Sequence, residues 1–177
     1  MLYYGAKELA FGIRTVRKNT IIIANEIPEE KYGFKPVPEC RSMAQLLTHI
    51  ALAPQFQYQL HAVEKRNSFE GVDFPALMSR LGAEEAKSRT RAQIIDLLKT
   101  EGEKMAAWLE GLSEEFLAQS FKMPEGSEPA AKSRFEMILS IKEHEMHHRG
   151  QLMLMERLVG IVPHLTRERE ARMAQSR

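Results

Sequence analysis

Histidines crowd one short stretch of the sequence, EHEMHHRGQ at residues 143–151, which holds three of the chain's six histidines. His144 and His148 are four residues apart, so on a helix they lie about 40° apart around the axis and one turn along it. Two imidazoles at that spacing can converge on one metal ion, about 2.0–2.1 Å from each nitrogen. His147 points elsewhere on such a helix, and we expect it to be a partly exposed residue at the rim of the site.

A third histidine, His49, interrupts a second apolar pattern. Apolar residues recur at helical spacing on either side of His49 and of the His144/His148 pair. The first stripe consists of Leu46, His49, Ile50, Ala53 and Leu60. The second consists of Met137, Ile141, His144, His148, Leu152, Met155 and Val159. His49 alone would be interpreted as a neutral buried histidine, but adjacent buried imidazoles need partners that an apolar stripe does not offer. The three together predict a site for one divalent metal with a coordination position open to water or substrate. Zinc, nickel and iron(II) all accept imidazole.

The same stretch also matches a peptidase pattern. His144, Glu145 and His148 satisfy H-E-x-x-H, and Glu168 lies downstream where a third ligand would be sought. Peptidases of that type generally hold their substrate against a strand edge, and this sequence has no convincing strand pattern. Glu145 could act as a base near the metal, but an exposed helix position is the expectation.

Three further residues have two interpretations each. Gln151 lies near the face of the paired histidines, where it would hydrogen-bond a ligand or a substrate, or else occupy a bundle or subunit seam. Glu101 would orient a histidine or, as we favour, face solvent. Cys40 precedes a predicted helix and would be a reactive thiol or, as we favour, a passive small residue. No catalytic residue is therefore assigned, and Gln151 and Glu145 are the candidates.

The elements that position these residues are helices. Hydroxyl residues followed three positions later by Gln or Glu predict capped helix starts at Ser42, Thr90 and Ser133. We expect long helices at residues 2–25, 42–66, 90–112 and 133–159. The connection 67–89 admits a short helix at 75–81, and residues 114–121 admit another before a Gly/Pro loop at 124–129. This pattern predicts an all-α four-helix bundle with a long crossover between helices two and three, in one domain at 1–165. A charged tail at 166–177 follows, which would either fray or extend as a surface helix.

Composition limits the classes of function. The chain has 177 residues, 44% hydrophobic and 28% charged, with a net charge of +1. That balance favours neither a nucleic-acid partner nor an anionic membrane. The single cysteine excludes an intrachain disulfide and suits a reducing cytosol. No signal peptide and no apolar run of membrane-spanning length is apparent, so we expect a cytoplasmic protein.

Two segments resemble a known family. IPEEKYGFKPVPECRSMAQLLTHIA at residues 27–51 and HEMHHRGQLMLMERLVG at residues 144–160 are similar to the DinB-like family of DNA-damage-inducible and thiol S-transferase bundles. In that family a proline-spaced loop leads into a helix with one histidine, and a late helix carries H-x-x-x-H followed by R-G-Q. The resemblance implies metal ligands at His49, His144 and His148, a four-helix bundle, zinc or nickel, and frequent homodimers. Some relatives use bacillithiol, mycothiol or a similar thiol, whereas many have no known activity.

Three classes of function follow from these residues. The first is a metal-dependent transferase that uses a low-molecular-weight thiol on a small electrophile, because a coordinating thiol is deprotonated. The second is a metal-binding stress protein without catalysis, and the third is a metallohydrolase. We also expect a homodimer, since the first helix carries apolar residues outside its main stripe that one core does not easily bury; they are Tyr4, Phe11, Ile21 and Ile22.

Overall fold

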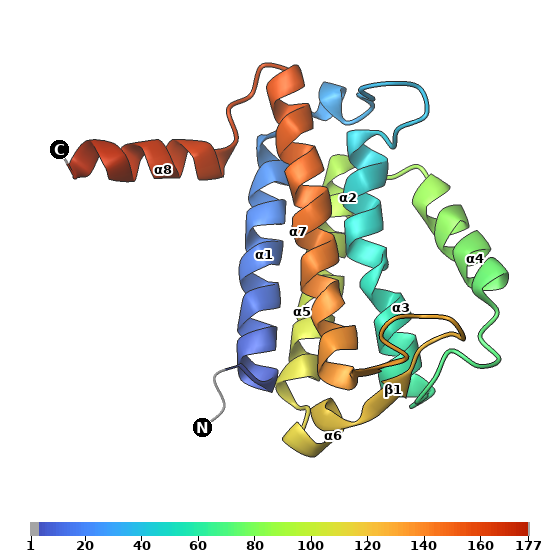
Figure 1. The fold of residues 1–177 in the computed structure, drawn as a ribbon. Coiled ribbons are helices and arrows are strands. Elements are labelled where there is room, and N and C mark those ends of the chain that lie inside the picture. Colours follow the sequence, from blue (N-terminus) through green and yellow to red (C-terminus); the bar gives the residue numbers. More distant parts are fainter. Residues whose placement is uncertain (1–3, 177) are drawn as a thin grey trace.

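Four long helices form a bundle in the computed structural model, which describes residues 4–176. They are α1 (Ala6–Glu26), α2 (Met43–Leu52), α5 (Arg91–Glu110) and α7 (Arg134–Leu158). Helices α1 and α7 run in one direction, and α2 and α5 run in the other (Figure 1). The predicted all-α class is therefore confirmed. Residue Leu2, which was expected to begin the first helix, lies outside the described residues.

The predicted helix starts are present as capping boxes. The Ser42, Thr90 and Ser133 side chains each accept a hydrogen bond from the backbone N–H three residues later, and the Gln or Glu at that position reaches back. Each pair satisfies two backbone N–H groups that a helix start leaves unpaired. At the other end of α7, Gly160 adopts a left-handed φ of 85°, which glycine does at little cost.

The second predicted helix is interrupted, so its expected continuity over residues 42–66 is wrong. Helix α2 is followed by α3 (Pro54–Tyr58) and by η2 (Gln59–Val63), a turn of π-helix. Pro54 has no backbone N–H, so the carbonyl of Ile50 loses its helical donor. The guanidinium of Arg17, on α1, donates to that carbonyl at 3.1 Å instead.

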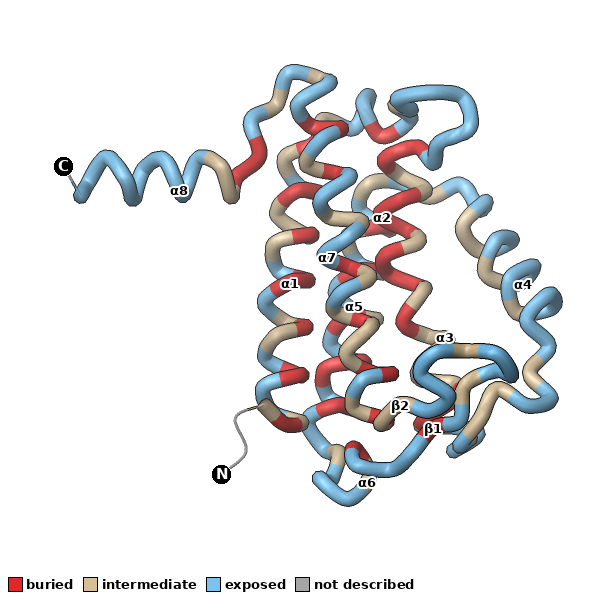
Figure 2. The backbone as a smooth tube through the Cα atoms, in the orientation of Figure 1, coloured by how far each residue is buried: buried red, intermediate tan, exposed pale blue. Residues whose placement is uncertain are grey.

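The crossover contains a longer helix than residues 75–81. Helix α4 (Phe74–Ala86) starts at the N-cap Asp73, whose carboxylate accepts from the N–H of Ala76 at 2.9 Å. It has no buried residue (Figure 2), yet it packs beside α2. It therefore covers one side of the bundle at the level of His49.

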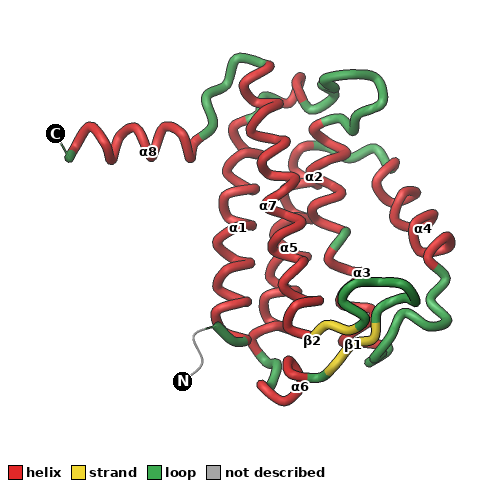
Figure 3. Tube along the Cα trace, viewed as in Figure 1, coloured by secondary structure: helices red, strands yellow, loops and turns green. Residues whose placement is uncertain are grey.

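A small sheet closes one end of the bundle, although the sequence shows no convincing strand pattern. Helix α6 (Glu114–Ala118) leads into β1 (Ser120–Lys122), which pairs antiparallel with β2 (Ala131–Ser133). The strands are visible below α7 in Figure 3. Each has only three residues, too few for an alternating pattern to be recognised in the sequence. Phe121 in β1 is fully buried.

The C-terminal segment, predicted as a charged tail, contains α8 (His164–Gln175). It projects from the bundle, and His164 is its one buried residue (Figures 1 and 2). A short 3₁₀ turn, η1 (Glu29–Lys31), lies in the loop after α1. Among the described residues, no helix is both long enough and apolar enough to cross a membrane.

Candidate metal centre

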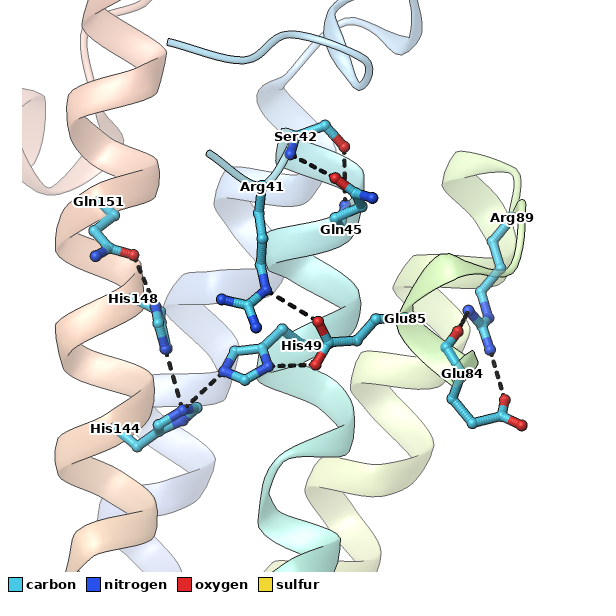
Figure 4. A network of polar contacts seen from close by, with 10 residues as sticks. All are labelled: Arg41, Ser42, Gln45, His49, Glu84, Glu85, Arg89, His144, His148 and Gln151. Carbon is cyan, nitrogen blue, oxygen red and sulfur yellow. Dashed lines mark hydrogen bonds and ion pairs between the residues drawn. The ribbon is translucent and has the colours of Figure 1, made fainter. Parts of the chain in front are cut away.

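The three predicted histidines meet between α2 and α7 (Figure 4). The Nε2 atom of His144 lies 3.0 Å from Nε2 of His49 and 3.1 Å from Nε2 of His148, and all three ligand atoms lie within 4.8 Å of one another. Two nitrogens on one ion at about 2.05 Å would be about 2.9 Å apart at a right angle and about 3.3 Å apart in a tetrahedron. The two distances from His144 therefore suit a shared metal ion.

In two of the histidines, the hydrogen bond of Nδ1 determines whether Nε2 has a lone pair available for a metal. Nδ1 of His49 lies 2.6 Å from a carboxylate oxygen of Glu85, and Nδ1 of His148 lies 2.7 Å from Oε1 of Gln151. Both oxygens accept, so each Nδ1 carries a proton, and in the neutral form of each ring Nε2 presents a lone pair. His144 can donate to only one of these lone pairs. At least one of the converging lone pairs therefore has no N–H group to accept from. A cation bound between the rings would satisfy all three nitrogens.

Burial keeps the imidazoles of His144 and His148 in the form that binds metal. It lowers the pKa of His144 to about 4, and the neighbouring His148 and His49 lower it further. Burial also lowers the pKa of His148, which outweighs the hydrogen bond to Gln151. These two rings are therefore neutral near pH 7, and neutral imidazole is the ligand form.

Glu85 is the residue at this site that the sequence analysis missed. Burial alone would raise the pKa of its carboxyl group, but hydrogen bonds from His49 and Arg41 together lower it. The ionised carboxylate accepts from Nε of Arg41 at 3.0 Å as well as from His49. A carboxylate behind a histidine orients the ring and raises its basicity toward a metal. The Asp73 cap followed by Pro75 could have predicted where α4 starts, but not that Glu85 reaches His49.

A buried ion pair fixes the orientation of helix α7 about its own axis. Glu145, the residue after His144, accepts from Nε of Arg17 at 2.9 Å and from the hydroxyl of Thr20 at 2.8 Å. The Arg17 side chain lies so close to α5 that a Cβ on Gly102 would be 2.7 Å from its Cγ. Glycine is thus required at 102 for this close approach. With Glu145 directed to α1, His144 and His148 face α2.

This ion pair overturns the expectation for Glu145. Glu145 was expected to be exposed, but only 1% of its surface is accessible, and its carboxylate is held by Arg17, so it is not available as a base at the histidines. Glu168, the conceivable third ligand of a peptidase site, lies exposed on α8, which projects from the bundle. The H-E-x-x-H match therefore has neither the base nor the third ligand of that class.

The other candidates divide between the site and the rest of the bundle. Gln151 lies at the site, where its amide also donates to Nε2 of the exposed His147 at 3.1 Å. Cys40 is exposed and lines a cavity that also touches His148. Glu101 is half-buried and accepts a hydrogen bond from the amide of Gln55 at 3.1 Å.

Two cavities adjoin the histidines on different sides. The larger, about 680 Å³, lies against His148 and Gln151 and is bordered by Lys35 and Arg41. The smaller, about 230 Å³, lies against His49 and His144 beneath α4 and has mainly apolar walls. A ligand in either cavity would therefore touch the candidate metal centre.

The comparisons with known proteins agree with this architecture. Residues 13–152 match the model of the DinB superfamily. A DinB-like protein from Bacillus subtilis has a similar solved structure, with a TM-score of 0.61 and 22% identity, covering 86% of this chain and 92% of that chain; at this identity the likeness shows the fold alone. None of the curated proteins compared with the sequence matches it. Because the family match spans most of the chain and includes all three histidines, the chain belongs to the DinB superfamily.

Proposed function

We propose that the protein is a metal-dependent transferase that joins a low-molecular-weight thiol to a small electrophile. The observation that carries this proposal is the convergence of three imidazole nitrogens with no fourth protein ligand in the group, among residues 4–176. Structural zinc sites use four protein ligands, whereas catalytic sites keep a position open. His49, His144 and His148 would hold the ion, with zinc or nickel as the proposed metal.

A divalent ion at this position supplies a Lewis acid that lowers the pKa of a coordinating thiol. In the transfer, the thiol sulfur forms a bond to the electrophilic carbon, the leaving group departs with its bonding electron pair, and the thiol proton passes to water. Lys35 and Arg41 border the cavity beside His148, so they would attract a thiol that carries carboxylate groups. Glu85 and Gln151 would keep the histidines oriented throughout.

Hydrolysis is supported less well by the same geometry. A metallohydrolase needs a base near the activated water, and the carboxylates of Glu145 and Glu85 are already held by Arg17 and by His49 with Arg41. A thiol brings its own nucleophile and needs no such base. A metal-binding role without catalysis is the alternative that the experiment below must exclude.

We also propose a homodimer in the cytoplasm, where low-molecular-weight thiols are kept reduced. Phe11 on α1 is 72% exposed, and Ile21 and Ile22 line an open groove between α1 and α5. Tyr4 instead packs edge-on against Phe135. Light scattering at micromolar concentration should give a dimer mass, and Phe11→Lys should shift it toward the monomer. A monomeric wild type would contradict this proposal.

The transferase proposal is tested by metal loading and thiol binding on the same preparations. Elemental analysis after reconstitution should give one metal per chain in the wild type and in His147→Ala, the matched control, and none in His144→Ala. Bacillithiol, mycothiol, glutathione and cysteine are then titrated into the cobalt-substituted protein, and transfer to 1-chloro-2,4-dinitrobenzene is followed. Metal loading without any spectral response to the thiols would favour the non-catalytic alternative. A metal-free wild type would refute the site itself.

A further inference from the structure

The smaller cavity beside the histidines has walls of a distinct chemistry. Its volume is about 230 Å³, and His49 and His144 form the side toward the candidate metal centre. The apolar walls come from the α2–α3 junction, α4 and α7, and consist of Ala53, Pro54, Phe56, Met78, Leu81 and Ile141. Apolar cavities of about 150 Å³ already accept benzene. This space therefore suits a group about the size of one substituted aromatic ring.

Two polar residues, Gln57 and Ser140, also line the cavity. Behind Gln57 lies His61, which is buried in the π-helical turn. A guanidinium nitrogen of Arg134 lies 2.7 Å from Nδ1 of His61, and Nε2 of His61 lies 3.0 Å from Oε1 of Gln57. A guanidinium only donates, so Nδ1 accepts and the proton of the neutral ring is on Nε2. Burial lowers the pKa of His61 to about 4, with a smaller contribution from Arg134, so the ring stays neutral near pH 7.

This chain of hydrogen bonds determines the orientation of the Gln57 amide. Its oxygen is engaged by His61, so its NH₂ group faces the other way, and one N–H is directed to the hydroxyl of Ser140 at 3.4 Å. That hydroxyl donates in turn to the carbonyl of Met137 at 2.5 Å. The second N–H of Gln57 has no partner among the described residues. Gln57 therefore offers a hydrogen-bond donor to whatever occupies the cavity.

We infer that this cavity binds a small, mainly apolar ligand group that carries a hydrogen-bond acceptor, and that Gln57 recognises the acceptor. The identification of that ligand with the electrophile rests on the proposed function, whereas the binding itself does not. Ligand sites commonly combine apolar walls with a few polar groups that fix orientation. A carbonyl, nitro or carboxylate oxygen would meet the donor of Gln57, while the apolar body would lie beside His49 and His144.

A matched pair of fluorinated probes tests this inference by ligand-detected ¹⁹F NMR on the zinc-loaded protein. The probe 4′-fluoroacetophenone has the acceptor, and 1-ethyl-4-fluorobenzene has nearly the same shape without it. Both should bind saturably, with the ketone about 5- to 10-fold tighter, the effect of one net hydrogen bond. In the cobalt-substituted protein both signals should broaden strongly, because the cavity adjoins the metal site.

Two substitutions and one control test whether the probes bind in this cavity and contact Gln57. Gln57→Leu removes the donor but keeps the volume, so it should erase the preference for the ketone while the ethyl probe still binds. Leu81→Trp should fill the cavity and abolish binding of both probes. Ala83→Trp, which adds the same side chain at an exposed position of α4, should leave both affinities unchanged. Circular dichroism checks that each variant is folded.

Three results would overturn the inference: no saturable binding to the wild type, equal affinity for the two probes, or binding that survives Leu81→Trp in a folded protein. Failure of the proposed function has a different signature. If the wild type binds both probes with the expected preference but shows no thiol response and no transfer, the cavity assignment stands and the transferase proposal falls.

Discussion

Two polar clusters occupy adjacent positions on α7, and they are built in opposite ways. Around Glu145, the guanidinium of Arg17 donates to both carboxylate oxygens and to the carbonyls of Leu98 and Ile50, so each buried polar group has a partner. Around His144, three nitrogens face one another with too few protons between them. A satisfied buried network helps to specify one arrangement of helices. The second cluster is the donor set of a possible cation site, so neighbouring residues of α7 belong to clusters of different chemistry.

Removing the carboxylate of the complete cluster should have the largest effect on stability. Glu145→Ala leaves the Arg17 charge buried and uncompensated, for which we expect a loss of about 3–5 kcal/mol in the free energy of unfolding. Urea denaturation of the metal-free protein measures it. Glu143→Ala, at an exposed position of the same helix, should change stability by less than about 0.5 kcal/mol. A loss as small as that of the control would contradict the structural role of the ion pair.

The two clusters also differ in how far the sequence could predict them. His144 and His148 are separated by one helical turn and interrupt an apolar stripe, so local periodicity was sufficient to place them together, and His49 followed from a second stripe. The burial of Glu145 depends on Arg17, 128 residues away, and no local pattern records that contact. Glu85 was missed for a related reason, because the path of the crossover decides which of its residues reaches α2. Pro54 itself is a local signal for the end of α2. The apolar periodicity continues on both sides of it, however, and therefore predicts one continuous helix.

Within the incomplete cluster, Glu85→Gln should lower metal affinity without unfolding the bundle. The amide keeps the shape of the side chain but loses the charge that supports Nδ1 of His49. Partners of this kind typically contribute roughly 10- to 100-fold in metal affinity. Competition with a chromophoric chelator measures the dissociation constant. The control is Glu84→Gln, whose carboxylate instead accepts from Lys87 and Arg89; equal effects of the two substitutions would contradict the role assigned to Glu85.

A second buried carboxylate on α7 extends the comparison, because it has no hydrogen-bond partner among residues 4–176. Glu156 is fully buried, and neither oxygen has a hydrogen bond within the described part of the chain. Burial, and then the nearby Glu26, raise its pKa from 4.5 to about 7, against smaller effects of Arg167 and Arg157. The folded protein thus holds a proton between pH 4.5 and 7 that the unfolded chain releases, so this group's contribution to stability declines as pH rises through that window.

Glu156→Gln should therefore stabilise the protein at pH 8 by about 1–2 kcal/mol and leave its stability nearly unchanged at pH 4.5. Urea denaturation at a series of pH values gives the profile. Glu170→Gln, at an exposed position of α8, should show no such dependence on pH. A stabilisation that is the same at pH 4.5 and pH 8 would show that the carboxyl group of Glu156 does not titrate in this window.

The smallest effect is expected at Gln151, and it distinguishes Gln151 from Glu85, the two hydrogen-bond partners of the candidate metal ligands. Gln151 supports Nδ1 of His148 as Glu85 supports Nδ1 of His49, but Gln151 is neutral and exposed, so water can replace its hydrogen bond. Gln151→Ala should accordingly weaken metal binding by only about 2- to 5-fold, a loss below about 1 kcal/mol. Because Gln151 also borders the cavity with Lys35 and Arg41, we expect a larger loss in thiol affinity than in metal affinity, measured by thiol titration of the cobalt-substituted variant. Suppose instead that Gln151→Ala lowers metal affinity as much as Glu85→Gln does. Charge and burial would then not explain how much a residue hydrogen-bonded to Nδ1 of a histidine contributes to metal affinity at this site.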